Sequence, residues 1–179
     1  MPYAYYARLK RRDQAIYRKS DAIVAIDLPQ PEPLVPLAQA VDTALQSADR
    51  AAVRRASQAL CDALLDSLRA PRVRLKVLTR RPSTSASELH GLYEPAEGGV
   101  PAVVTVWMQT SAKRRTVAFR TFLRTLLHEL CHHLDYELLG LEDSFHTEGF
   151  FKRESSLFKQ IVAQPSAGKG GSFVKSAFK

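Results

Sequence analysis

The sequence predicts an α+β fold, in which a small antiparallel or mixed three-stranded sheet packs on a long helix and further helices lie at the N-terminus. Two observations support this class. Apolar residues recur at helical spacing over residues 34–68 and again over 116–162, whereas residues 72–110 contain three short segments typical of strands. With 179 residues and 45% hydrophobic content, the chain is long enough for one globular domain with an ordinary core.

The N-terminal part is expected to be helical. A first helix over residues 3–20 carries tyrosines among many basic residues, which suits either a nucleic-acid-binding arm or, more simply, a solvated basic surface. A proline-rich connector follows, because each proline lacks a backbone donor and restricts its predecessor. Two packed helices are then predicted within residues 34–68, with Ser47 or Asp49 capping the second.

Three strands are expected in the middle of the chain. Val73, Leu75 and Val77 alternate with arginine and lysine, which marks a half-buried strand with one basic face. The stretch LHGLYEP, ending at Pro95, is a second candidate, and residues 102–110 form the strongest strand pattern. Because the segments between them are short, we expect antiparallel pairing.

The C-terminal part predicts a long helix from Thr116 to Leu139, which Gly140 ends. A further helix is expected from Thr147 to Val162, with Thr147 as its cap. A flexible basic tail follows. The chain is thus expected to contain a helical region packed on the core, the core itself and the tail, over residues 1–70, 71–163 and 164–179.

The long helix contains His128, Glu129 and His132 in the order H-E-x-x-H. Histidines four residues apart lie on one helix face and reach a single ion, and the intervening glutamate can contact the water bound to that ion. Zinc lowers the pKa of its water to about 7, and a nearby carboxylate can accept the proton and return it to a leaving amine. The spacing therefore predicts a zinc-dependent hydrolase with Glu129 as general base.

A third protein ligand has to come from outside this helix. His146 is the first choice, because imidazole is a preferred zinc ligand and the residue lies just before the next helix. Glu154 and Glu148 are alternatives, because a set of two histidines and one glutamate is equally sound chemistry.

Other polar residues near the motif are candidates for supporting roles. His133 is rotated by about 100° from His132 around the helix, so we expect it to face solvent or to lie behind the ligands. Asp135 either accepts the second ring proton of a ligand histidine or is a plain solvated carboxylate. Tyr93, Tyr136 and His133 are the candidates for stabilising an oxyanion.

Three stretches together resemble the SprT-like family of zinc metalloproteases, which includes the Spartan DNA–protein crosslink proteases, and more broadly the small zincins called minigluzincins. They are LLHELCHHLDY at residues 126–136, the later His146, and GFFKR at residues 149–153. The resemblance covers mainly residues 92–158. By position it implies zinc binding by three histidines and catalysis by the motif glutamate, namely His128, His132, His146 and Glu129.

The resemblance also implies a zincin-like fold with a metallopeptidase core, in which a strand preceding the active-site helix borders the cleft. Residues 102–110 are the expected cleft-edge strand, to which an extended peptide could add by backbone hydrogen bonds. Trp107 or Met108 would then line the cleft. This chain has Thr147 where family members usually have glycine, which keeps the two glutamates open as ligands.

Charge and cysteine content limit the partners and the compartment. The net charge of +8 favours polyanions such as DNA as a candidate partner beside a protein or peptide substrate. Cys61 and Cys131 fall in apolar helical patterns and are too few for a disulfide framework or for the C-terminal zinc ribbon of many bacterial family members. Without a signal-peptide pattern or a membrane span, we expect a cytoplasmic protein with no membrane partner.

The alternative function is a basic nucleic-acid-binding or regulatory module with a structural zinc site. It is suggested by the positive charge of the first helix, of residues 111–125 and of the tail.

Overall fold

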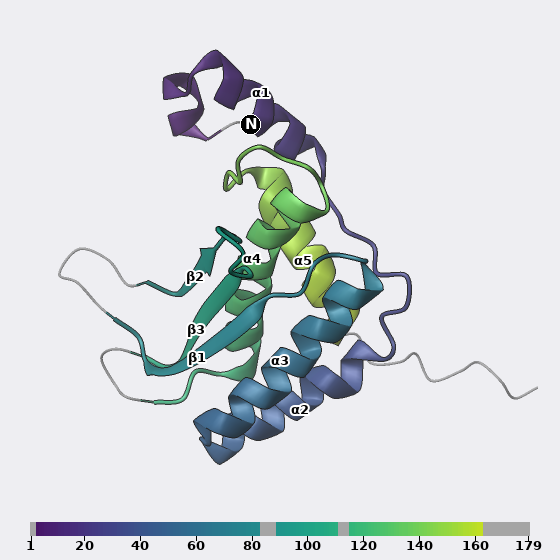
Figure 1. Ribbon diagram of the computed structural model, residues 1–179, viewed down its shortest axis with the longest axis vertical. Coiled ribbons are helices and arrows are strands. Elements are labelled where there is room, and N and C mark those ends of the chain that lie inside the picture. Colours follow the sequence, from purple (N-terminus) through teal and green to yellow (C-terminus); the bar gives the residue numbers. More distant parts are fainter. Residues whose placement is uncertain (1–2, 83–88, 111–114, 163–179) are drawn as a thin grey trace, which may run out of the picture.

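The computed structural model describes residues 3–82, 89–110 and 115–162. Within these ranges the protein has five α-helices, one short 3-10 helix and a mixed three-stranded sheet, which confirms the α+β class (Figure 1). The predicted tail lies outside the described residues. The elements in chain order are η1 (Ala4–Arg8), α1 (Arg11–Ala22), α2 (Leu34–Ser47), α3 (Arg50–Ser67), β1 (Arg74–Arg80), β2 (Gly91–Glu94), β3 (Val103–Gln109), α4 (Phe119–Glu137) and α5 (Glu148–Val162).

The single helix expected over residues 3–20 is in fact two elements, η1 and α1. Leu9 and Lys10 between them have extended backbone, with ψ of 148° and 158°. The side-chain amide of Gln14 donates to the carbonyls of Tyr6 and Leu9, at 3.3 and 3.2 Å. These side-chain hydrogen bonds satisfy carbonyl groups that a continuous helix would have used, so the chain turns before α1 begins.

The starts of helices α3 and α5 follow the predicted signals. Asp49, rather than Ser47, caps α3, because its Oδ1 accepts from the backbone N–H of Ala51 at 2.8 Å. Thr147 caps α5, since the N–H of Phe150 donates to its Oγ1 at 2.9 Å. Helix α4 ends at Glu137, two residues before the expected Leu139, and Gly140, with its left-handed φ of +58°, lies three residues beyond this end rather than at the cap.

The strand order is β1-β3-β2, so β3 lies in the centre of the sheet and β2 at one edge (Figure 1). Strand β2 pairs antiparallel with β3, but β1 and β3 are parallel. The expectation of antiparallel pairing throughout was wrong, and the mixed alternative is correct. Parallel neighbours need a crossover of a dozen or more residues, and residues 81–102, which include β2, form that connection.

Strand β3 is therefore not the expected cleft-edge strand. It has a hydrogen-bonded neighbour on both sides, so its backbone offers no open edge. Its residues Trp107 and Met108 are only 6% and 1% exposed, and neither lines the cavity described below. Because the crossover pairs β3 with β1 on one side and β2 pairs with β3 on the other, β3 is the central strand and β2 is an edge strand.

The core lies between the sheet and the helices. Helix α4 packs on β2 and β3, α3 packs on β1, and α5 packs on α4 from the other side, with α2 beside α3 (Figure 1). Cys61 and Cys131 are fully buried in this core, as predicted from their apolar surroundings. Among the described residues, no helix combines the length and apolar character that crossing a bilayer requires.

Candidate metal centre

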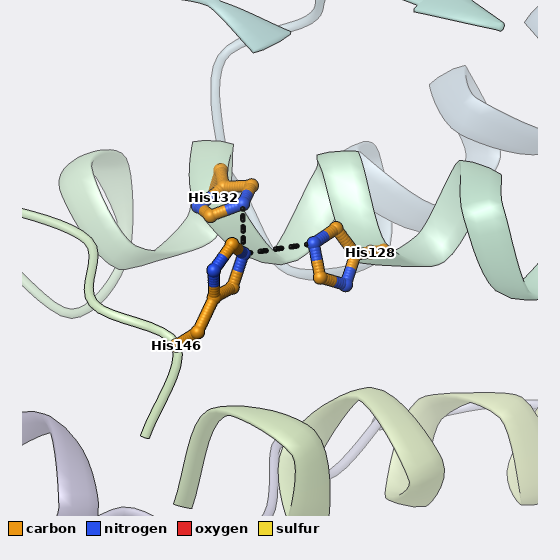
Figure 2. Close-up of side chains that lie close together, drawn as sticks. All are labelled: His128, His132 and His146. Carbon is orange, nitrogen blue, oxygen red and sulfur yellow. Dashed lines mark hydrogen bonds between the residues drawn. The ribbon is translucent and has the colours of Figure 1, made fainter. Parts of the chain in front are cut away.

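Three histidine side chains converge beside helix α4. His128 and His132 lie one turn apart on this helix, as the four-residue spacing predicts, and His146 reaches them from the loop before α5 (Figure 2). The Nε2 atom of His146 lies 2.9 Å from Nε2 of His128 and 3.1 Å from Nε2 of His132. In the part of the chain that the structure describes, this is the one cluster of such residues close enough to hold a metal ion.

The loop between α4 and α5 is fixed so that it returns His146 to the helix. Gly140 adopts its left-handed conformation, and the next residue, Leu141, is buried and donates its N–H to the carbonyl of Asp135 at 2.8 Å. From the N-terminal segment, the Tyr5 hydroxyl donates to the carbonyl of His146 at 3.0 Å. The third histidine is thus held from both ends of its loop.

The two alternative glutamates are not in the cluster. Glu154 lies behind His128, with its Oε2 3.2 Å from Nδ1 of that ring and its Oε1 3.3 Å from Arg124. Because a carboxylate only accepts, His128 donates through Nδ1 and its Nε2 presents a lone pair to the centre. Glu148 instead forms a partly exposed pair with Lys152 at 2.7 Å.

Two of the three imidazoles, those of His132 and His146, are held in the neutral form that binds metals. Burial, together with the nearby His128 and His146, lowers the pKa of His132 to about 3. Burial also lowers the pKa of His146, with His128 acting in the same direction. At neutral pH both rings therefore carry a free lone pair, so protons compete little with a cation for these nitrogens.

Asp135 is linked to His132 by two hydrogen bonds that share the hydroxyl of Ser144, not by a direct one. The Nδ1 atom of His132 lies 2.7 Å from Ser144 Oγ, and this hydroxyl donates to Asp135 Oδ2 at 2.7 Å. Asp135 is fully buried and pairs with the equally buried Arg153, so the solvated alternative is wrong. Burial raises the pKa of Asp135, whereas Arg153 and Ser144 act against this rise. The spacing in the sequence indicated Asp135 as a partner of a ligand histidine, but no local pattern indicated that Ser144 would lie between them.

Glu129 faces the cavity from α4 and lies against β2. Burial raises its pKa to about 7, with nearby His128 opposing the rise. A Cβ atom added to Gly91 of β2 would lie 2.3 Å from Glu129 Oε1, so only glycine leaves room for this side chain. Sequence reasoning missed Gly91, although a glycine within a strand is itself a signal of close approach.

The three oxyanion candidates differ in their surroundings. His133 is buried rather than solvent-facing, and its Nε2 lies 2.7 Å from the carbonyl of Pro71, so Nε2 is the donor there. Its Nδ1 must then accept the proton of the Tyr93 hydroxyl at 3.2 Å. The Tyr136 hydroxyl donates to Asp143 over a longer 3.4 Å. Both tyrosines line the cavity, and the Tyr136 hydroxyl makes the longer hydrogen bond, so its proton is more available to another acceptor.

The cavity that contains these groups has a volume of about 610 Å³. Residues of strand β2, of α4 and of the loop with Ser144 and His146 line it, together with Glu154 of α5. The cavity thus brings together residues of an edge strand, the carboxylate of Glu129 and three imidazole side chains. Such a site can hold a divalent cation with an accessible coordination position beside a base.

Comparison with known proteins yields no relative. No protein-family model, no curated protein and no solved structure matches the chain. The resemblance to SprT-like metalloproteases therefore depends on the motif residues alone, namely residues 126–136, His146 and residues 149–153.

Proposed function

We propose that this protein is a zinc-dependent metalloendopeptidase of the SprT-like type, with a zincin-like core. The observation that supports the proposal is the convergence of His128, His132 and His146 in a cavity that also contains Glu129. Three imidazoles with one open position are the ligand set of a catalytic rather than a structural zinc site.

The donor set suits zinc. In a tetrahedral site with Zn–N bonds of about 2.0–2.1 Å, the nitrogens are about 3.3 Å apart. The observed separations of His146 Nε2 from its two neighbours, 2.9 and 3.1 Å, are close to this value. Bound zinc would supply a water of lowered pKa and polarise a substrate carbonyl.

Glu129 is the proposed general base. Its carboxylate would accept a proton from the attacking water and pass it to the leaving amine. Burial, which raises its pKa to about 7, makes it readier to take a proton at neutral pH than an exposed glutamate. Tyr136 is the proposed donor to the developing oxyanion, because the proton of Tyr93 is already given to His133.

The substrate is proposed to be an extended, unstructured protein segment. Strand β2 is the edge strand next to the histidines, and Gly91, Leu92 and Tyr93 of this strand line the cavity. An extended chain could pair with its backbone there, and such pairing accepts many sequences. The sequence suggested residues 102–110 as the strand that pairs with substrate, but β3 is the central strand, so we propose β2 for this role instead.

The decisive experiment replaces Glu129 with glutamine. We expect Glu129→Gln to bind stoichiometric zinc but to cleave casein about 10²- to 10⁴-fold more slowly, because the base is lost while the ligands remain. Glu148→Gln, which alters a glutamate outside the cluster, is the matched control and should cleave like the parent.

Equal cleavage by Glu129→Gln and the parent would refute the mechanism. If zinc is bound but neither protein cleaves any unstructured substrate, the alternative of a structural zinc in a nucleic-acid-binding module would take its place.

A further inference from the structure

We infer that Ser144 is a positioning residue for the metal site, whose hydroxyl fixes His132 in the tautomer that turns a lone pair toward the other two histidines. The inference rests on the proposed metal site, but it concerns protons within this chain. No sequence pattern indicated Ser144, which lies two residues before His146 in the same loop.

The positions of the protons follow from counting donors. A serine hydroxyl has one proton, and Ser144 Oγ lies 2.7 Å from both Asp135 Oδ2 and His132 Nδ1. A carboxylate can only accept, so the serine proton goes to Asp135. The serine oxygen must then accept from Nδ1–H of His132. A neutral imidazole protonated at Nδ1 has a bare Nε2, which is the atom 3.1 Å from His146.

Arg153 keeps this arrangement from reversing. Its guanidinium donates to both oxygens of Asp135 at 2.7 to 3.0 Å, and both side chains are completely buried. Protonating Asp135 would leave a guanidinium buried without a counter-charge, which is costly. Arg153 also donates to the carbonyls of Ser20 and Ile23 at the end of α1. With His132 donating to Ser144 and Ser144 donating to Asp135, each of these hydrogen bonds has one proton and one acceptor, and the buried Asp135 stays ionised beside Arg153.

The two histidines of α4 are oriented by different means. His128 contacts a carboxylate, Glu154, directly, whereas His132 reaches its carboxylate through a hydroxyl that belongs to the loop. Because Ser144 and His146 lie in one loop, docking of this loop brings the third ligand and sets the tautomer of the second in the same step. A loop displaced from α4 would lose both.

The test reads the tautomer directly in the metal-free protein labelled with ¹⁵N, from the two-bond proton–nitrogen correlations of the histidine rings. We expect His132 of the parent to carry its proton on Nδ1. Ser144→Ala should shift the ring toward the Nε2–H form, and Ser144→Thr, which keeps the hydroxyl, should restore the parent tautomer. Ser67→Ala, which removes a hydroxyl that donates only to the carbonyl of Leu64 in the last turn of α3, should leave the ring unchanged.

Zinc affinity, measured by competition with a chelator, provides the second readout. Ser144→Ala should bind zinc about 10-fold more weakly or worse, with recovery in Ser144→Thr, as is typical when a partner behind a ligand is lost. A parent ring protonated on Nε2 would overturn the inference. So would a folded Ser144→Ala with unchanged tautomer and unchanged affinity.

The parent measurement needs no substitution, so it decides the question even if Ser144→Ala folds poorly. A parent with zinc bound and Nδ1 protonated but no peptidase activity would support this inference and refute the proposed function. An active peptidase with His132 protonated on Nε2 would support the proposed function and refute this inference.

Discussion

At the scale of single residues, Gly91 sets the position of the proposed base. Because a Cβ at this position would lie 2.3 Å from Glu129 Oε1, Gly91→Ala must displace the carboxylate or the strand. We expect kcat/KM on casein to fall by about 10- to 100-fold with zinc content unchanged, since misplacement of a catalytic group by about 1 Å is this costly. Glu94→Ala, in the same strand but on the other face of the sheet, is the control. Full activity of Gly91→Ala would show that the contact is unimportant.

The third ligand is tested by metal content after dialysis. We expect His146→Ala to lose zinc, because its Nε2 is one of the three converging atoms. Glu154→Gln should retain zinc with about 10-fold lower affinity, since it replaces the charged acceptor behind His128 with a neutral amide oxygen. Glu148→Gln should bind zinc as the parent does. Zinc loss in Glu148→Gln with retention in His146→Ala would contradict this ligand set.

The sequence indicated those site residues whose placement is local. Helical spacing alone places His128, Glu129 and His132 together, and a glycine after the helix allowed the choice of His146. Gly91 and Ser144 could not be found in this way, because their roles depend on the approach of β2 and the loop to α4. Such approaches are decided by tertiary packing rather than by neighbours in sequence.

At the scale of elements, the pair of Arg153 and Asp135 joins α5 to α4 and, through the carbonyls of Ser20 and Ile23, to α1. Arg153→Met would leave the carboxylate buried without its partner. We expect the free energy of unfolding in urea to fall by about 3–5 kcal/mol.

The control for this prediction is another arginine that pairs with an acid. Arg12 of α1 binds Glu142, but both side chains are largely exposed, so Arg12→Met should change stability little. Equal effects of the two substitutions would mean that burial does not decide the strength of the Arg153 pair.

The helices could be predicted more fully than the sheet. Apolar periodicity and caps such as Asp49 and Thr147 are read from adjacent residues, and α2 to α5 were found with ends differing by only a few residues. The three strands were also found. Their order was not, because pairing joins residues far apart in sequence and the central position of β3 depends on a crossover.

At the scale of the whole molecule, both cysteines report on the integrity of the core. Cys61 and Cys131 are completely buried, and burial raises the pKa of both thiols, so neither forms the reactive thiolate. We expect Ellman's reagent to leave the native protein unmodified at pH 8 and to titrate both thiols in urea. Rapid modification of the native protein would show that this core opens readily.

The contact of Tyr5 with His146 has a consequence for the order in which the protein is assembled. The two residues are 141 positions apart, and the pairs of Arg12 with Glu142 and of Arg153 with Ser20 span similar separations. During synthesis the N-terminal segment emerges first but has to wait for nearly all of the described chain before these contacts form. A growing polypeptide therefore carries the HELCH helix without a completed site. The chain should therefore acquire its proposed peptidase activity only after the described part of the chain has folded.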